Sequence, residues 1–117
     1  MSVTILKHKG KEIVFVDHQG LTGEKLIANM KEGSKVLLQR GKGNLSLTNF
    51  SDANLSNDAV EYVKSNEMRE VVKCIEKDAF IGLGGIQKLV FNIYLKITGS
   101  KGKVFKTAEE AKDYLVS

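Results

Sequence analysis

An uninterrupted hydrophobic run, Ile13-Val14-Phe15-Val16, lies near the start of the chain. A strand without polar alternation is typical of a sheet that helices cover on both faces. A second β-branched run precedes it at residues 3–6, and polar residues 8–11 separate the two. This pattern predicts an antiparallel hairpin in which Gly10 takes the left-handed conformation of the turn.

The next segment has a helical period and predicts an amphipathic helix over residues 24–40, ended by Gly41 and Gly43. Its hydrophobic stripe consists of Leu26, Ile27, Met30, Leu37 and Leu38. Gly33 and Ser34 lie in the middle of this stripe. Glycine is a poor helix former, so this pair is a candidate point of interruption.

Residues 44–50 alternate well enough to predict a strand, with Leu45 and Leu47 on one face and Ser46 and Thr48 on the other.

Ser56 is a suitable helix N-cap, and Asp58 in the following turn complements the helix dipole. A short helix is therefore expected to begin there and to end near residue 65. Residues 67–73 predict a second helical piece, and residues 74–83 a further strand.

The strongest helical period follows the glycine-rich turn at residues 82–85. Its positions are Ile86, Leu89, Val90, Ile93, Tyr94 and Ile97. A strand over residues 89–97 is the competing prediction, since the segment is rich in β-branched and aromatic residues, but its length and period favour a helix. Additional apolar residues widen the stripe, so we expect burial on two sides. The candidate interface or ligand groove consists of Ile86, Val90, Phe91, Tyr94 and Leu95.

Residues 103–106 predict a short last strand, and Thr107-Ala108-Glu109-Glu110 is a capping box that opens the last helix. Strands that alternate with helices indicate a largely parallel sheet. The sequence therefore predicts a single α/β domain over residues 1–117. It has a mixed, mostly parallel sheet, opened by an antiparallel hairpin, and about four helices.

Composition narrows the class of protein. The chain has 117 residues, a net charge of +4 and a single cysteine. One cysteine excludes an internal disulfide framework and is typical of a reducing compartment. The sequence shows neither a signal peptide nor an apolar run near the ~20 residues of a membrane span. We therefore expect a small cytoplasmic domain.

Catalytic chemistry is not visible in the residue pattern. Cys74 is the only thiol, and no local signature pairs it with His8 or His18. We expect Cys74 to pack as a small hydrophobe. Nothing in the sequence separates a surface position from a buried one for the two histidines. No catalytic residue, metal site or cofactor is predicted.

The glycine-rich turn allows one functional interpretation. Glycines between a strand and a helix can direct backbone N–H groups towards an anion. Gly82, Gly84 and Gly85 are therefore candidates for anion or phosphate binding, although the favoured interpretation is a tight turn. The lysines lack interleaved aromatic residues and a groove-reading motif, so nucleic acid is not an expected partner.

Three segments, ILKHKGKEIVFVD (5–17), IGLGGIQKLVFN (81–92) and VFKTAEEAKDYL (104–115), resemble a known family. It is the STAS-like family of small bacterial proteins (sulphate transporter and anti-sigma factor antagonist domains), which is grouped with the CRAL-TRIO lipid-transfer fold. The resemblance implies a mixed sheet with packed helices that acts as a protein-interaction or small-ligand module.

In anti-sigma factor antagonists, a serine at the start of the helix after the third strand is phosphorylated within an Asp-Ser-Ser/Thr-Gly motif. The matching region here reads SDANLSND (51–58) and lacks that motif. Ser56 has the corresponding position and is expected to serve as an N-cap. The candidate switch or partner-binding residues are Asp52, Asn54 and Ser56.

We therefore expect a non-enzymatic regulatory or protein-interaction module, with a protein partner or a second copy of the chain bound at its surface. The alternative is a carrier domain for a small anionic or apolar, lipid-like ligand held between the helix after residue 85 and the sheet.

Overall fold

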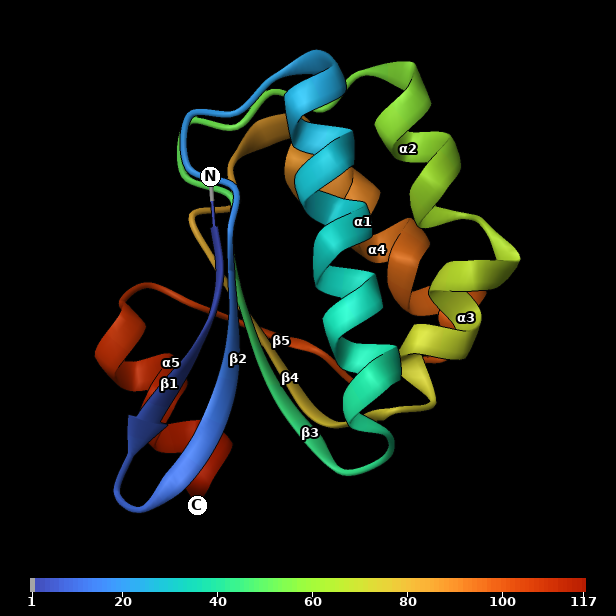
Figure 1. Cartoon of the computed structure of the whole chain (residues 1–117). Helices are drawn as coiled ribbons and strands as arrows, with labels where there is room; N and C mark the ends of the chain where they lie inside the picture. Colours follow the sequence, from blue (N-terminus) through green and yellow to red (C-terminus); the bar gives the residue numbers. More distant parts are fainter. Residues whose placement is uncertain (1) are drawn as a thin grey trace.

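The computed structural model describes residues 2–117. Over this range the chain forms one five-stranded sheet in the order β1-β2-β3-β4-β5, with five helices packed on it (Figure 1). The strands are β1 (Ser2–His8), β2 (Lys11–Asp17), β3 (Asn44–Asn49), β4 (Ile75–Ile81) and β5 (Lys103–Phe105). The helices are α1 (Gly23–Arg40), α2 (Asn57–Val63), α3 (Asn66–Val72), α4 (Gly85–Thr98) and α5 (Ala108–Val116).

The strand directions confirm the predicted sheet. β1 runs antiparallel to β2, and the three other neighbouring pairs are parallel. The hairpin turn consists of Lys9 and Gly10, with φ of 50° and 80°. Two successive positive φ values match the right-handed twist of the flanking strands, so the left-handed position predicted for Gly10 is confirmed.

The structure has five helices over residues 2–117 where the sequence predicts about four. The extra helix is α3, which corresponds to the predicted helical piece after residue 66. The hydroxyl of Ser56 caps α2 by accepting from the backbone N–H of Ala59 at 3.2 Å. The hydroxyl of Ser65 caps α3 in the same way, with Met68 as donor at 3.2 Å. A second N-cap therefore separates two short helices.

The helices lie on both faces of the sheet, with α5 alone on one face and α1 to α4 on the other (Figure 1). β3 is central, and all six of its residues are buried. Leu45 and Leu47 belong to the cluster that packs against Leu115 of α5. Ser46 and Thr48 line the opposite, helix-covered face. The predicted alternation is confirmed, although both faces are covered.

The candidate interruption at Gly33 and Ser34 does not occur, because α1 is continuous from Gly23 to Arg40. Both residues are buried. A Cβ at residue 33 would lie 3.1 Å from both γ-methyl groups of Val16. The hydroxyl of Ser34 accepts a hydrogen bond from Tyr62 at 2.7 Å. The two residues allow α1 to approach β2 and α2 closely.

The helix after residue 85 is confirmed and the competing strand is wrong, since α4 runs from Gly85 to Thr98. It ends at Gly99, which has the left-handed φ of 75° of a helix C-cap. Over residues 2–117, no helix is long and apolar enough to cross a membrane.

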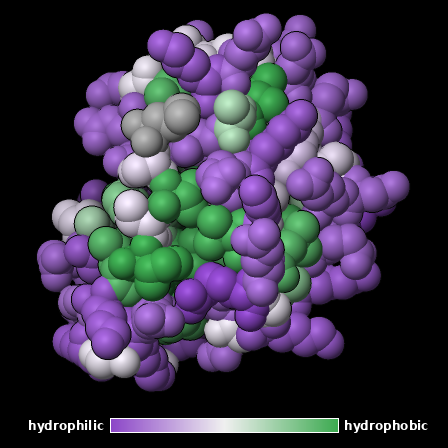
Figure 2. Space-filling view, in the orientation of Figure 1, coloured by the Kyte–Doolittle hydropathy of each residue, from purple (hydrophilic) through white to green (hydrophobic). Residues whose placement is uncertain are grey.

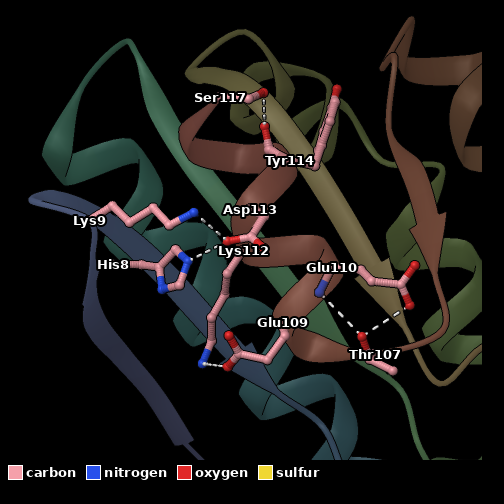
Figure 3. Close-up of polar contacts among 9 residues, drawn as sticks. All are labelled: His8, Lys9, Thr107, Glu109, Glu110, Lys112, Asp113, Tyr114 and Ser117. Atoms are coloured by element: carbon pink, nitrogen blue, oxygen red, sulfur yellow. Dashed lines mark hydrogen bonds and ion pairs between the residues drawn. The ribbon is translucent and has the colours of Figure 1, made fainter.

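α5 is connected to the β1–β2 hairpin and capped at its own start (Figure 3). Asp113 accepts from Nε2 of His8 at 2.8 Å and forms an ion pair with Lys9 at 3.1 Å. The hydroxyl of Thr107 accepts from the backbone N–H of Glu110 at 3.2 Å, which confirms the N-cap half of the predicted capping box, while the Glu110 carboxylate accepts from the Thr107 hydroxyl. These contacts fix α5 against the face that carries Leu45 and Leu47.

Candidate functional site

An internal cavity lies between the sheet and the helices α1, α3 and α4. Its volume is about 90 Å³, and most of its wall is apolar. The sheet side consists of Val16, Ser46, Thr48, Ile75, Asp78 and Phe80. The helix side consists mainly of Met30, Leu37, Met68, Val71, Val90, Phe91 and Tyr94. The space therefore lies where an α/β protein normally packs its core.

Polar residues occupy the sheet side of this cavity. Ser46 lies opposite Asp78 in the β3–β4 register, and Thr48 follows Ser46 on the same face. All three are buried, with exposed fractions of 2%, 5% and 7% for Ser46, Asp78 and Thr48. Among residues 2–117, neither hydroxyl of Ser46 and Thr48 is hydrogen-bonded to another protein group, and no fully buried side-chain N or O atom lacks a partner, so both hydroxyls are reached from the cavity. Two hydroxyl groups thus line the cavity with free hydrogen-bonding capacity.

His18 completes the polar side of the cavity. It follows β2 and is buried, with 2% of its surface exposed and its ring centroid 4.9 Å from that of Phe50. Burial lowers the pKa of His18 from 6.5 to about 4, and the Asp17 carboxylate opposes this shift. The imidazole is therefore neutral at pH 7. The structure thus places His18 in the interior, whereas the sequence does not separate a buried position from a surface one.

The contacts of Asn29 determine the tautomer of His18. Its Nδ2 lies 2.9 Å from the backbone oxygen of Asp17, which can only accept, so this atom must be the amide nitrogen. The same Nδ2 lies 3.0 Å from Nδ1 of His18, which must therefore be the acceptor. In the neutral ring the proton is then on Nε2. No protein acceptor for this N–H is found within residues 2–117.

Asp78 and Tyr94 form a buried pair across the cavity wall. The Tyr94 hydroxyl donates to Oδ2 of Asp78, and the Ser100 hydroxyl lies 3.2 Å from the same oxygen. Burial raises the pKa of Asp78 to about 7, against the lowering effect of these two hydrogen bonds. Burial, together with the Asp78 charge, raises the pKa of Tyr94 well above its usual value.

The loops at the carboxyl ends of β2, β3 and β4 meet beside the cavity. The backbone N–H of Gly20 donates to Ser51 at 3.0 Å, and that of Asn54 donates to Leu21 at 3.0 Å. Gly82, with φ of 77°, packs directly against the backbone of Ser51. In parallel α/β sheets, this edge is where ligands usually bind.

The structure brings the predicted switch or partner-binding segment (residues 52–56) and the glycine-rich turn (residues 82–85) together around a shallow hollow. Its walls are formed by Ala53, Asn54, Leu55, Gly84, Ile86 and Gln87. Asn54 is exposed, whereas Ser56 uses its hydroxyl to cap α2. Asp52 is exposed in a tight turn with φ of 58° and lies outside this wall. The partner-binding role of these residues remains a prediction.

The glycine-rich turn uses part of its hydrogen-bonding capacity internally. The backbone N–H of Gly84 donates to Oε1 of Gln87 at 2.9 Å. The Nε2 of the same side chain donates to the backbone oxygen of Ala53. The tight turn is therefore held by Gln87, and anion binding by Gly82, Gly84 and Gly85 remains a prediction.

The predicted groove on α4 is divided between two environments. Val90, Phe91 and Tyr94 line the cavity, and Leu95 packs on the same hydrophobic cluster. Ile86 faces the surface hollow and is 70% exposed. Leu89 is also 65% exposed, so α4 is buried on one side rather than on two.

The remaining reactive side chains are dispersed. Cys74 is partly exposed, with its sulfur 3.7 Å from the backbone oxygen of Glu70. Within residues 2–117, no cluster of three or more His, Cys, Asp or Glu side chains could hold a metal ion.

The comparisons with known proteins address the fold. No protein-family model matches the chain, and no curated protein matches it. A crystal structure of an uncharacterised DUF3478-family protein from Shewanella loihica PV-4, described as having a SpoIIAA-like fold, superposes with a TM-score of 0.71. The match covers 97% of this chain and 92% of that chain.

The fold is SpoIIAA-like. The STAS-like architecture expected from the sequence is therefore confirmed. At 18% sequence identity, the SpoIIAA-like match carries information about the fold alone.

Sequence reasoning missed the polar group formed by His18, Ser46, Thr48 and Asp78. A signal was present in β4, where Asp78 directly precedes the apolar run Ala79-Phe80-Ile81. A carboxylate at that point of a doubly covered strand is unusual, because buried charged groups need specific partners.

Proposed function

We propose that this domain is a binding module that holds a small, largely apolar ligand in the cavity beneath α4. The observation that carries the proposal is the pair of Ser46 and Thr48 hydroxyls, which have no protein partner and line an otherwise mainly apolar cavity wall. Buried polar groups are almost always hydrogen-bonded, so groups of this kind at a cavity support a ligand with its own polar atom.

A binding role is favoured over catalysis by the surroundings of the polar side chains. Nδ1 of His18 accepts from Asn29, which leaves no basic nitrogen free on the neutral ring. In the part of the chain described by the structure, no serine, threonine or cysteine is hydrogen-bonded to His18. A nucleophile requires an adjacent base, and this arrangement does not supply one.

Native mass spectrometry of the purified protein tests this proposal. Val90→Phe fills the cavity, and Val104→Phe makes the same change on an exposed part of β5. We expect a bound small molecule on the wild type and on Val104→Phe, and none on Val90→Phe. The proposal would be contradicted if the wild type carries no bound molecule and if no compound in a panel of small apolar compounds changes its Tm.

A protein partner at the neighbouring surface is the second candidate function, and it agrees with the regulatory role expected from the sequence. Ile86 and Leu89 are 70% and 65% exposed, and exposed apolar residues beside a hollow are typical of interaction sites. Leu55 and Gln87 line both the hollow and the cavity, so a ligand and a partner would share part of one wall.

Pull-down with variants tests the second candidate. Ile86→Asp and Asn54→Lys should abolish capture of a specific partner without changing Tm, whereas Val104→Asp should not affect it. Equal capture by all variants would contradict a role for this surface.

Association of two copies and a cytoplasmic location are retained as predictions. Figure 2 shows a hydrophobic area that extends from the β1–β2 hairpin towards α1. The exposed large hydrophobic side chains of these elements are Ile5 and Leu38, at 42% and 39%. Sedimentation of the wild type and of Ile5→Lys measures whether this face associates.

A further inference from the structure

The charges around the cavity limit which ligands it can hold. The cavity wall contains no lysine or arginine among residues 2–117. Its titratable residues are His18, Asp78 and Tyr94. An anionic ligand would lose its hydration without gaining a counter-ion and would lie near the Asp78 carboxyl, which is costly in a buried site.

A cationic ligand is also disfavoured. His18 belongs to the cavity wall, and its neutral ring has a donor on Nε2 and no free acceptor. Oδ2 of Asp78 already accepts from Tyr94 and lies 3.2 Å from the Ser100 hydroxyl. Pairing an ammonium group with Asp78 would remove two charges from water inside a mainly apolar cavity, and this desolvation often costs more than the pair gains.

The free groups suit a neutral polar atom. The Ser46 and Thr48 hydroxyls can each donate and accept, and Nε2 of His18 can donate. A hydroxyl or carbonyl oxygen on the ligand can satisfy these groups without introducing a charge.

The size and shape of the cavity limit the apolar part of the ligand. Its volume is about 90 Å³, below the ~150 Å³ of an engineered protein cavity that binds benzene. Met30 and Met68 belong to the wall, and methionine side chains adapt readily to a bound group. A single small ring therefore fits only if these methionine side chains move, and nothing larger is expected to bind.

We infer that the cavity binds an uncharged small molecule, about the size of one ring, whose hydroxyl or carbonyl group is held by Thr48, Ser46 and His18. This inference rests on the proposed ligand-binding function and names the chemical class of the ligand. It also rejects the anionic half of the alternative expected from the sequence, as far as this cavity is concerned.

Four probes that share one benzene ring test the inference at pH 7: benzene, phenol, benzoate and benzylamine. Their dissociation constants are measured by methyl-group NMR titration of the full chain. We expect benzene to bind and phenol to bind about 3- to 10-fold more tightly, which is the usual effect of one net hydrogen bond. Benzoate and benzylamine should bind more weakly than phenol.

The Thr48→Val variant removes the hydroxyl and keeps the shape of the side chain. It should reduce the preference for phenol over benzene and leave benzene affinity unchanged. Thr22→Val, on an exposed residue, is the matched control and should behave as the wild type. Retained benzene binding shows that the Thr48→Val cavity is folded.

The outcomes separate the two claims. If none of the four probes binds, the proposed function and the inference both fail. If benzene binds but phenol binds no more tightly, or benzoate or benzylamine binds best, the inference fails and the proposed function stands. If Thr48→Val lowers benzene and phenol affinity equally, Thr48 does not recognise the polar group and the inference fails.

Discussion

The hydroxyl of Tyr94, on α4, donates a hydrogen bond to Oδ2 of Asp78, on β4, and so joins helix and sheet at the wall of the cavity. Both side chains are buried, with 8% and 5% of their surface exposed. The sequence predicts Tyr94 as part of an interface or ligand groove, whereas it predicts no role for Asp78. The buried carboxyl also makes the stability of the protein depend on pH.

Asp78→Asn should change the pH dependence of unfolding. The pKa of Asp78 is about 7 in the folded protein and about 3.8 without burial. Between these values only the folded state holds the proton, so raising the pH destabilises the wild type. At about 1.4 kcal/mol per pKa unit, the loss is roughly 4 kcal/mol. The Asp78→Asn variant has no such loss. Its free energy of unfolding, minus that of the wild type, should therefore increase from pH 4 to pH 7. Urea unfolding at each pH measures this difference.

Asp113→Asn is a contrasting control, because hydrogen bonds from His8 and Lys9 lower the pKa of the exposed Asp113 (Figure 3). A carboxylate favoured by folding stabilises the protein at neutral pH, and this effect is lost in acid. The stability gap between this variant and the wild type should therefore narrow as the pH falls. Parallel pH profiles for both variants would contradict the assignment for Asp78.

His18→Gln should remove a loss of stability in acid. The folded pKa of His18 is about 4 and the unfolded value 6.5, so between them only the unfolded state binds the proton. Lowering the pH from 6.5 to 4 therefore destabilises the wild type by roughly 3 kcal/mol. Glutamine keeps an acceptor for Asn29 and does not titrate, so the variant should gain relative to the wild type in acid. NMR of the imidazole nitrogens should find the proton on Nε2, and a proton on Nδ1 would contradict the tautomer.

Gly33→Ala should destabilise the protein, although alanine is the better helix former by about 1 kcal/mol. The new Cβ would lie 3.1 Å from both γ-methyl groups of Val16. Overpacking of this kind usually costs ~1–3 kcal/mol. Thermal unfolding should show a reduced Tm, and the double variant with Val16→Ala should recover part of it. Additive losses in the double variant would show that the contact is not the cause.

Gly82→Ala should destabilise more than Gly43→Ala, which is its matched control. Both glycines have a positive φ, of 77° and 89°, and share the strain of a left-handed residue. A Cβ at residue 82 would lie 2.8 Å from the Cα of Ser51, whereas at residue 43 it meets nothing within 4 Å. We expect the free energies of unfolding to differ by at least about 2 kcal/mol, on the scale of an overpacked core. Equal losses would contradict the close approach of the two loops.

The sequence predicts the elements of this fold better than it predicts the cavity. The uninterrupted run at residues 13–16 and the helical period after residue 85 each report a local pattern, and both are correct. The interruption of α1 predicted at Gly33 and Ser34 is wrong. These small residues are explained by contacts with Val16 and Tyr62 on other elements, which helix propensity does not include.

The polar side of the cavity depends on strand register, which no single segment contains. From the sequence alone, the alternation predicts that Ser46 points away from the core. Its partner in the sheet, Asp78, is 32 positions away in the sequence. The two become neighbours only when β3 and β4 pair. The position of His18 depends in the same way on Asn29, which lies on another element.

Methyl-group NMR under xenon pressure can measure whether a mainly apolar cavity lies between the sheet and α4. Xenon enters apolar cavities of proteins without needing a polar contact. We expect saturable shifts at the methyl groups of Val16, Met30 and Val90, and we expect those of Val16 and Met30 to be lost in Val90→Phe. Shifts confined to the exposed Ile86 and Leu89, with none in the interior, would contradict the presence of this cavity.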